Sequence, residues 1–367
     1  MKLIKVAIVG TQGVPANYGG FESLVENIIG ENCPKDVHYT VFCSSSDMPS
    51  TPTEHKGATL KYVRMHANGA HSIPYDIISM CRAISGYDVI LILGVSGCFF
   101  LPLLRLMSRS KIIVNIDGLE HKRAKWGRTA RWVLRNSEAM AVRYADIIVA
   151  DNKGIQDYVT DTYGRQSELI AYGGDHVHRN LPHSMMKNIL KEYNLKKDKY
   201  AITVCRIEPE NNSHIILKAF ADTDYPLVFI GNWHHSEWSR QLKARYDNSP
   251  NITLLDAIYD LDILYTLRSN AGIYIHGHSA GGTNPSLVEA MHFGMPVIAC
   301  DVVYNRETTE GKAYYFKNSS ELKALLSRHD LDGSEMKEIA NRRYTWRHIS
   351  EQYCRLFRQA RSKIVHQ

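Results

Sequence analysis

The fold is decided by residues 278–299, which read HSAGGTNPSLVEAMHFGMPVIA. Within this stretch Asn284 is a good helix N-cap, and Pro285 suits the first helical position. Gly294 can adopt the left-handed conformation that commonly ends a helix. The segment therefore predicts a short helix over about residues 285–293, between a glycine-rich loop and a buried strand.

Short β-branched runs alternate with longer amphipathic segments on both sides of this helix. The runs are VAIVG, YTVFCS, LKYVRM, DVILILG, KIIVNID and DIIVAD in the first half, then AITVC, LVFIG, NITLLD, GIYIH and PVIACD. Such alternation is typical of βαβ units and mainly parallel sheets. Because open α/β sheets bind ligands at the carboxyl ends of their strands, we expect the site to lie there.

The alternation breaks once, between residues 172 and 198, where Gly-Gly, several histidines and a Lys-rich polar stretch follow one another. We interpret this segment as a domain junction and hinge. A chain of 367 residues is also longer than one typical core requires. Two consecutive Rossmann-like halves are the expected organisation, and the predicted fold class is α/β.

Composition excludes several classes of protein. The net charge of +6 is a mild excess and does not indicate a nucleic-acid-binding protein. The seven cysteines have no C-x-x-C spacing, which favours reduced thiols in a cytoplasmic protein. The longest apolar stretch, from Val89 to Leu104, has 16 uncharged residues, whereas a membrane span needs about 20. We therefore expect any membrane association to be peripheral.

The predicted helix carries the clearest ligand-binding pattern. The loop before it contains Gly281, Gly282, Thr283 and Asn284. Free backbone N–H groups there, together with the helix dipole, favour an anion such as a diphosphate. Glu289 lies about one turn further on, where a carboxylate can accept hydrogen bonds from a ribose diol. The alternative is a capped core helix with a solvated glutamate.

Three other features follow strands. Arg206 comes directly after AITVC and can bind a diphosphate through two parallel N–H bonds; the alternative is a surface ion pair with Glu208 or Glu210. Asp117 ends the run KIIVNID, and either orients a hydroxyl or forms a turn.

The loop GTQGVPANYGGFE lacks the G-x-G-x-x-G fingerprint, which disfavours a simple dehydrogenase. Its glycines either allow close approach of a ligand or belong to an ordinary flexible loop.

Four segments together carry a resemblance to a known family: GTQGVPANYGGFE, DGLEHKRAKW, RIEPENN and HSAGGTNPSLVEAM. The chain resembles glycosyltransferase family 4, which contains retaining enzymes of the GT-B fold, over nearly its whole length. More narrowly, it resembles the bacterial rhamnosyltransferase branch of capsule and O-antigen synthesis. The resemblance implies two Rossmann-like domains, an interdomain cleft, and a C-terminal helix that crosses back to the first domain. It also implies front-face attack, in which the leaving phosphate itself takes the acceptor's proton.

The resemblance also implies domain roles. We expect an N-terminal acceptor domain at residues 1–173 and a nucleotide-sugar donor domain at 174–348. A C-terminal helix at 349–367 is expected to pack toward the first domain.

Two departures from the family concern the donor. Family members bind the diphosphate with an Arg and a Lys five positions later. Arg206 matches, and Asn211, which stands where the Lys is usual, is also expected to contact the donor. Family members also carry two glutamates eight residues apart; Glu289 matches the second, and Gly281 replaces the first. As a hypothesis, the backbone N–H groups of residues 281–284 replace the missing carboxylate. Many members have a His near the reacting centre where this chain has Asp117.

The remaining expectations concern the acceptor. Gly13 is expected to contact the donor, and the predicted acceptor contacts are Tyr18, Gly19, Gly20, Glu120, His121, Lys122 and Arg123. From Lys122 to Arg135 the chain is basic, with interleaved Trp residues and no acidic residue. Such a segment can dock on an anionic membrane beside a lipid-diphosphate-linked acceptor. The alternative is a solvated helix face.

The sequence thus predicts a retaining glycosyltransferase that moves a sugar, with rhamnose favoured, from a nucleoside-diphosphate donor to a glycan hydroxyl. The predicted catalytic residues are Asp117, Arg206 and Glu289. No metal or other cofactor is expected, and the expected partners are the donor, a lipid-linked glycan acceptor and the inner face of the cytoplasmic membrane, with no nucleic acid. The alternatives are a sugar-nucleotide 2-epimerase and a non-catalytic sugar-nucleotide-binding protein.

Overall fold

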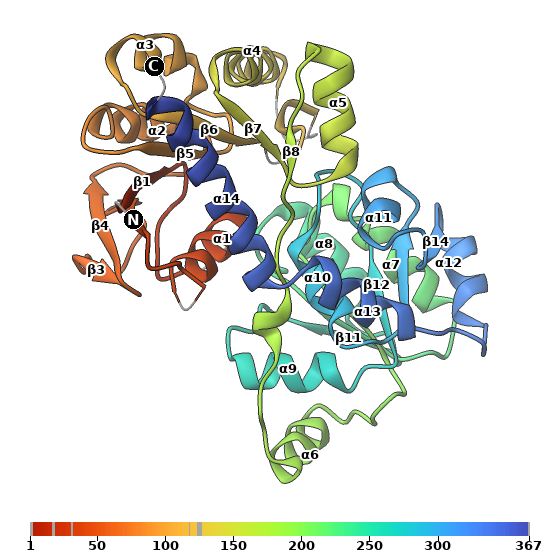
Figure 1. Ribbon diagram of the computed structural model, residues 1–367. Helices are drawn as coiled ribbons and strands as arrows, with labels where there is room; N and C mark the ends of the chain where they lie inside the picture. The colour runs from red at the N-terminus through yellow and green to blue at the C-terminus, as the bar shows by residue number, and fades with distance from the viewer. Residues whose placement is uncertain (1–2, 17–18, 31, 117, 123–126, 366–367) are drawn as a thin grey trace. The chain divides into compact units, whose positions relative to one another are not determined.

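The computed structural model describes residues 3–16, 19–30, 32–116, 118–122 and 127–365. It contains two compact units (Figure 1). Unit 1 is Met1–Tyr172 with Trp346–Gln367, and unit 2 is Gly173–Thr345. Each unit is built on a sheet of mainly parallel strands with helices packed on it, which confirms the predicted α/β class.

The sheet of unit 1 has the strand order β3-β4-β2-β1-β5-β6-β7-β8. The strands are β1 (Ile4–Val9), β2 (Val37–Ser44), β3 (Glu54–His55), β4 (Ala58–Val63), β5 (Val89–Leu93), β6 (Lys111–Ile116), β7 (Ile147–Ala150) and β8 (Glu168–Leu169). Neighbouring strands are parallel except β3, which forms an antiparallel hairpin with β4. The strand order reverses between β1 and β5, so the loops after these strands flank a topological switch point.

The helices of unit 1 are α1 (Gly20–Ile28), α2 (Ser72–Arg82), α3 (Leu101–Met107), α4 (Arg128–Tyr144), α5 (Lys153–Tyr163) and α14 (Trp346–Val365). Helix α14 comes from the end of the chain but packs on α1 and on the strands of unit 1. Its Tyr353 hydroxyl accepts a 2.7 Å hydrogen bond from Asn115, and its Arg358 guanidinium donates two bonds to Asp36. The C-terminal helix is therefore part of the first unit.

Unit 2 has a fully parallel sheet in the order β11-β10-β9-β12-β13-β14. The strands are β9 (Ala201–Val204), β10 (Leu227–Ile230), β11 (Ile252–Leu255), β12 (Ile273–His276), β13 (Val297–Cys300) and β14 (Tyr314–Phe316). Strand β14 is not among the strand runs that the sequence predicts, which end at PVIACD. This strand has only three residues, too few to show a period, and its pairing with β13 decides it.

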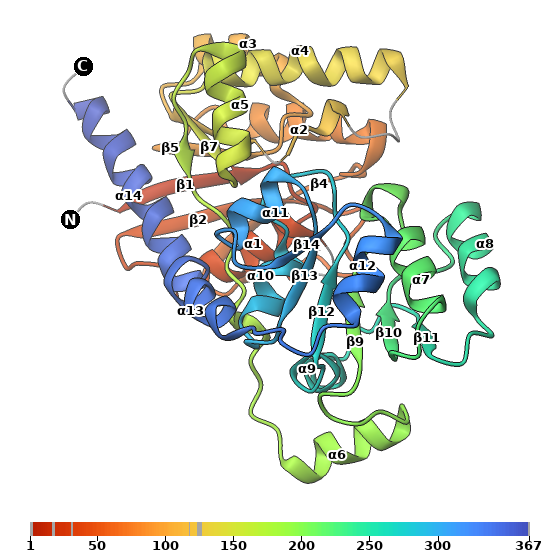
Figure 2. The ribbon, with the colours of Figure 1, turned by 90° about the vertical axis from the view of Figure 1, so that its right-hand side faces the viewer.

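The helices of unit 2 are α6 (His183–Glu192), α7 (Ser213–Ala221), α8 (Glu237–Tyr246), α9 (Leu261–Ser269), α10 (Pro285–Met291), α11 (Val303–Thr308), α12 (Ser319–Leu326) and α13 (Ser334–Arg343). Figure 2 shows several of them around the sheet of this unit. Helix α10 forms where the Asn284-Pro285 signal predicts it, and Gly294 has the expected positive φ of 72°. Helix α6 lies inside the segment that we interpreted as a junction.

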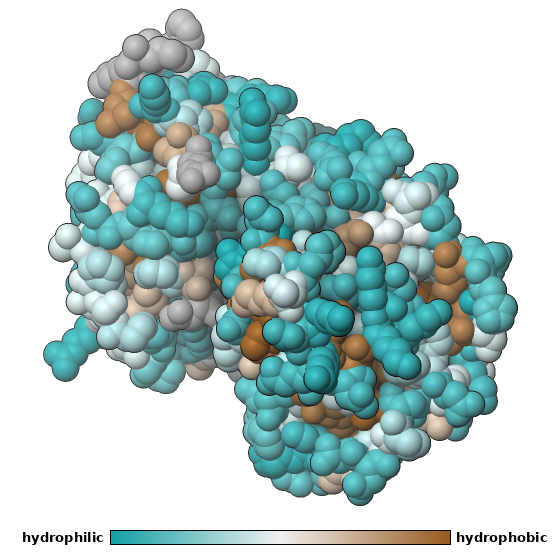
Figure 3. Space-filling view, turned by 90° about the horizontal axis from the view of Figure 1, so that it is seen from below, coloured by the Kyte–Doolittle hydropathy of each residue, from teal (hydrophilic) through white to brown (hydrophobic). Residues whose placement is uncertain are grey.

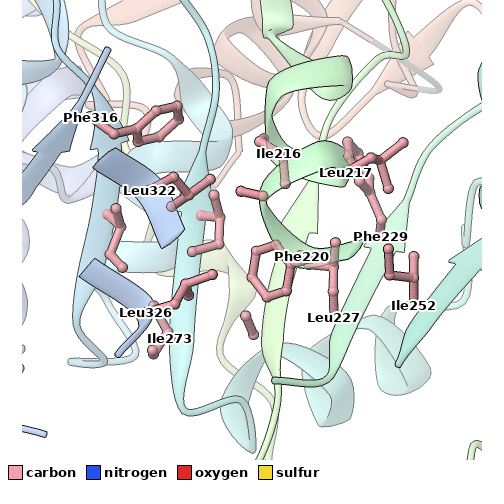
Figure 4. Packing of buried hydrophobic residues seen from close by; sticks show 14 of the residues in the cluster. Ile216, Leu217, Phe220, Leu227, Phe229, Ile252, Ile273, Phe316, Leu322 and Leu326 are labelled. Atoms are coloured by element: carbon pink, nitrogen blue, oxygen red, sulfur yellow. The ribbon is translucent and has the colours of Figure 1, made fainter. Parts of the chain in front are cut away.

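The core of unit 2 gathers around α7 and α12 (Figure 4). Leu217 and Phe220 of α7 and Leu322 of α12 pack together with strand residues such as Phe229 and Phe316, all of them fully buried. Each such side chain contributes about 1.5–3 kcal/mol through removal of apolar surface from water. The core therefore holds β9 and its neighbours firmly, and with them the loops that leave their carboxyl ends.

Within the described part of the chain, no helix is long and apolar enough to cross a membrane. The face of the molecule in Figure 3 is mostly hydrophilic, and its apolar residues form small separate groups.

Asp76, on α2, is a carboxyl group inside unit 1, with 5% of its surface exposed. A Cβ added at Gly97 would lie 2.5 Å from the Cβ of Asp76, so the loop after β5 covers this carboxyl closely. Burial raises the pKa of Asp76 to about 8, against a smaller opposing effect of a hydrogen bond from the Gly97 backbone. The carboxyl is therefore protonated in the folded protein at neutral pH.

We predict that Asp76→Asn removes part of the pH dependence of stability. Between about pH 4 and pH 8 the unfolded chain has lost this proton while the folded chain keeps it, so the free energy of unfolding falls as pH rises. In urea unfolding, the free energy of unfolding of the variant, relative to that of wild type, should therefore rise by about 4 kcal/mol from pH 4.5 to pH 7.5. Parallel pH profiles of the two proteins would contradict the burial of this carboxyl.

Candidate functional site

The strand order of unit 2 reverses between the neighbouring strands β9 and β12, and the loops after these strands are joined. The backbone N–H and the hydroxyl of Ser279 both donate to the Glu210 carbonyl, at 2.9 and 2.8 Å. The Asn212 amide donates to the Gly277 carbonyl at 2.9 Å. A Cβ at Gly277 would lie 2.1 Å from the Asn211 carbonyl oxygen, so glycine is required for this close approach. Switch points of this kind are where open α/β sheets bind ligands.

Arg206 lies at the start of the first of these loops, and its side chain is exposed. Among the described residues, no carboxylate forms an ion pair with it, which argues against the alternative of a surface pair. The side chain of Asn211 is buried, and its amide donates a 2.8 Å hydrogen bond to the Arg206 carbonyl. Asn211 therefore fixes the backbone of the arginine, a role that the sequence pattern did not predict.

The second loop leads into α10. The Asn284 side-chain oxygen accepts bonds from the Ser286 backbone N–H and hydroxyl, at 3.0 and 2.7 Å, which caps the helix as predicted. Gly281 has a φ of 107°, and a Cβ there would meet nothing within 4 Å. The conformation, rather than lack of space, requires glycine at this position. Gly282 follows it directly, and Thr283 is buried.

Glu289 is held in an ion-pair network rather than solvated. Its Oε2 lies 2.8 Å from Nη1 of Arg268 on α9, and its Oε1 lies 3.5 Å from Nε2 of His176. The side chains of Arg268 and Glu289 are 5% and 13% exposed. Burial lowers the pKa of His176, although the charge of Glu289 opposes this effect. Because an ionised carboxylate has about four acceptor positions, Glu289 keeps acceptor capacity for a ligand diol.

Sequence reasoning missed both partners of Glu289. Arg268 is in the last turn of α9, where a cation usually interacts with the helix dipole at the surface. His176 is in the short 3₁₀ helix η4 (Asp175–Val177), within the polar segment interpreted as a junction. The sequence signal that could have located His176 is the Gly173-Gly174 pair just before it. A Cβ at Gly174 would lie 2.8 Å from the Glu289 backbone nitrogen, so glycine allows this segment to approach α10 closely.

Tyr274, His276 and His278 form a column of rings along β12 and its exit. The ring centroids of Tyr274 and His276 are 5.9 Å apart, and those of His276 and His278 are 4.5 Å apart. Burial lowers the pKa of His276 to about 3, so its ring is neutral. Across the described residues, no three His, Cys, Asp or Glu side chains gather in a way that could hold a metal ion.

In unit 1, the glycine-rich loop after β1 is fixed as far as residue 16. Oε1 of Glu22, on α1, accepts hydrogen bonds from the Thr11 hydroxyl and the Gln12 backbone N–H, at 2.9 and 2.8 Å. Gly13 has a φ of 126°, and a Cβ there would lie 2.7 Å from the Cys43 sulfur. Gly19 is the N-cap of α1, and Gly20 is its first residue. Residues 11–13 of this loop are therefore held by specific contacts to Glu22 and Cys43.

The predicted acceptor residues Glu120, His121 and Lys122 form a 3₁₀ turn, η3, shortly after β6. Nδ1 of His121 lies 3.1 Å from the Glu138 carboxylate, a partner that the sequence did not reveal. Tyr18, Asp117 and Arg123 lie outside the described residues. Their roles, like those of the other site residues, stay predictions.

We predict that Arg268 and Glu289 are energetically coupled. Arg268→Met leaves the Glu289 carboxylate with only the more distant His176 as a partner and should lower the free energy of unfolding by about 3 kcal/mol. Glu289→Gln should also destabilise the protein, because the buried guanidinium of Arg268 then lacks its carboxylate. The double variant should lose less than the sum of the single losses, because it leaves neither charge unpaired. Urea unfolding of the four proteins measures this coupling, and additive losses would contradict it.

Two family comparisons cover most of the chain. Residues 185–330 match the family described as Glycosyl transferases group 1. Residues 3–175 match a family described as Domain of unknown function (DUF1972). A comparison with curated proteins gives no match.

Solved structures resemble the whole chain. Sucrose-phosphate synthase from Thermosynechococcus elongatus has 18% identity and a TM-score of 0.80, over 97% of this chain and 98% of that one. Anabaena HepE in complex with UDP has 15% identity and a TM-score of 0.75, over 98% and 100%. The catalytic domain of Arabidopsis thaliana starch synthase IV, bound to ADP and acarbose, has 12% identity and a TM-score of 0.73, over 99% and 100%. At these identities the likeness shows the fold, so the chain has the GT-B fold, and its residues 185–330 match the family of group 1 glycosyl transferases.

Proposed function

We propose that this protein is a retaining glycosyltransferase that moves a sugar from a nucleoside-diphosphate donor to a hydroxyl group of a glycan. The observation that carries this proposal is the pair of joined loops at the switch point of unit 2, within the group 1 domain. One loop presents the exposed Arg206, and the other leads to Glu289. A guanidinium and a carboxylate so placed match a diphosphate and a ribose diol.

The proposed chemistry depends on charge that develops on the leaving group. As the bond between the anomeric carbon and the diphosphate oxygen breaks, negative charge grows on the diphosphate. Arg206 stabilises that charge, and the backbone N–H groups of residues 281–284 add to it. Asn211 holds the Arg206 backbone in place through its hydrogen bond, so little reorganisation is needed during the reaction.

Glu289 binds the ribose in this proposal. Arg268 and His176 hold its carboxylate from within unit 2, which limits its rotation and leaves acceptor positions for the diol. The proposed donor is dTDP-rhamnose, on the strength of the narrower sequence resemblance. Asp117 is proposed to orient a hydroxyl near the reacting carbon.

We predict that Arg206→Ala abolishes most donor binding and transfer. A panel of UDP-, GDP- and dTDP-sugars is first tested for thermal stabilisation, since a ligand at 100 times its Kd stabilises by about 2.7 kcal/mol. With the best donor, Arg206→Ala should weaken binding about tenfold or more, because a charge-assisted bond contributes about 1.5–3 kcal/mol. Arg206→Lys should recover only part of it, since lysine cannot make the planar double contact.

The control is Arg328→Ala, which removes an exposed arginine of unit 2 that pairs with Asp330. Its binding should equal that of wild type. Unchanged binding in Arg206→Ala contradicts the diphosphate role. Donor binding without transfer to any acceptor favours a non-catalytic protein, and conversion of free donor to its 2-epimer favours an epimerase.

We propose that the acceptor is a lipid-diphosphate-linked glycan and that unit 1 docks on an anionic membrane. The supporting observation is a surface on α3 and α4, which pack against each other. On α3, the large apolar residues Leu103, Leu106 and Met107 are 49%, 85% and 54% exposed, and on α4 Trp132 is 65% exposed. The exposed arginines of the same stretch of α4 are Arg128, Arg131 and Arg135. Exposed apolar residues beside cations suit the interface of an anionic bilayer.

We predict that the protein floats with vesicles in which roughly one lipid in three is the anionic phosphatidylglycerol. It should not float with vesicles of pure phosphatidylcholine. Leu106→Ser and Trp132→Ala should each reduce the floated fraction, and raised salt should reduce it further, because salt screens the arginines. The matched control is Leu261→Ser, which changes an exposed leucine of unit 2. Equal flotation with both lipids, or no flotation at all, contradicts the docking proposal.

A further inference from the structure

His278 follows strand β12 at the switch point of unit 2, and both of its chain neighbours contact the loop after β9. On one side, Gly277 packs so closely against that loop that a Cβ would lie 2.1 Å from a carbonyl oxygen. On the other side, the backbone N–H and the hydroxyl of Ser279 donate to the Glu210 carbonyl. The backbone of His278 is therefore fixed beside the loop that begins at Arg206.

The ring of His278 is positioned by stacking. Tyr274, His276 and His278 alternate along one face of β12 and its exit. The rings of His276 and His278 are 15° from parallel, with centroids 4.5 Å apart. His276 is fully buried, and neither of its ring nitrogens has a hydrogen-bond partner among the described residues. Because burial lowers the pKa of His276 to about 3, its ring is a flat, uncharged support for that of His278.

This column of rings lies between the exit of β9 and helix α10. The Tyr274 hydroxyl donates to the carbonyl of Val204, the last residue of β9, at 3.5 Å. Burial raises the pKa of this hydroxyl, and the charge of Arg268 and a hydrogen bond with Ser286 on α10 oppose this effect. The face of β12 that carries His278 is therefore the face next to both of the joined loops.

His278 can supply a hydrogen-bond donor to an anion bound at these loops. The residue is half-buried, and its Nδ1 is buried, which leaves Nε2 as the ring nitrogen that can meet a ligand. An imidazole can carry a proton on Nε2 in both its neutral and its charged form. Hydrogen bonds from such a group to phosphate oxygens are charge-assisted, and therefore short and strong.

The geometry of the neighbouring loop gives this donor a role. The buried Asn211 stands where the resembled family has a lysine, and its amide donates to the Arg206 carbonyl rather than outward. Arg206 itself is exposed. A guanidinium binds two phosphate oxygens side by side, and a diphosphate has further charged oxygens that need donors. His278 is the residue whose neighbours in the chain touch this loop directly.

We propose that Nε2 of His278 donates a hydrogen bond to the diphosphate of the sugar donor, in place of the lysine that is absent at position 211. This inference rests on the proposed glycosyltransferase function. His278 and Arg206 then stabilise together the negative charge that grows on the leaving diphosphate. The imidazole keeps its proton throughout, so the acceptor's proton passes to the leaving phosphate, as the resemblance implies.

Three substitutions separate donation of a hydrogen bond from packing of the ring. His278→Phe keeps a flat ring against His276 but has no N–H. His278→Gln has no ring but keeps an N–H near the position of Nε2, and His278→Leu has neither. Calorimetry measures the Kd of the nucleoside diphosphate that corresponds to the best donor of the sugar-nucleotide panel, for wild type and for each variant.

His278→Phe and His278→Leu should each raise this Kd about tenfold or more, because each removes a hydrogen bond to a charged group. His278→Gln should stay within about threefold of wild type, since its amide can still donate. A ring that serves only for packing predicts the opposite order. Wild-type affinity in His278→Phe, or a loss in His278→Gln as large as in His278→Leu, overturns the inference.

The matched control is His329→Phe, which makes the same change at an exposed histidine after α12 and should leave the Kd unchanged. Melting temperatures show whether each variant is folded. If His278→Phe is destabilised, the comparison of His278→Gln with His278→Leu still decides, because neither introduces a ring. A wild-type protein that binds none of UDP, GDP and dTDP refutes the proposed function itself, and this inference with it.

Discussion

The close contact between the loops after β9 and β12 is the constraint on which the candidate site of unit 2 depends. The Asn211 carbonyl lies so near Gly277 that no side chain fits there, and Ser279 and Asn212 bond across the gap to backbone carbonyls. Since buried backbone groups must be paired, these bonds fix both loops without any ligand. Arg206 and the start of α10 therefore occupy defined positions before a donor arrives.

A second constraint acts through buried charges that are paired with partners remote in sequence. Glu289 is held by Arg268, and Glu138 is held by two tyrosines and His121. Burying an unpaired carboxylate would cost several kcal/mol, so each of these side chains is restricted to the geometry of its partners. In both units, a buried carboxylate lies close to residues proposed to contact substrate. Each unit thus uses a buried, paired carboxylate to hold polar groups in place, although the sequences of the two units differ.

Much of this fold could be predicted from the sequence because its signals are local. The Asn284-Pro285 pair predicts the start of α10, and the alternation of strands and helices predicts the α/β class. The strand β14 could not be predicted, because three residues carry no measurable period. Arg268 and Glu138 could not be predicted as buried either, since a charged residue on an amphipathic helix is normally solvated and only the tertiary partner reverses this. The sequence therefore indicates where the proposed donor loops lie, whereas the partners of the buried charges are known only from the structure.

The central claim is that the joined loops of unit 2 bind a nucleoside diphosphate. Hydrogen exchange of backbone amides, measured by mass spectrometry with and without the nucleoside diphosphate of the preferred donor, tests this most directly. The account predicts slower exchange on binding in residues 205–212 and 277–289, with little change in α8 and α12. Protection confined to other parts of the chain, or none at a saturating concentration, would contradict it.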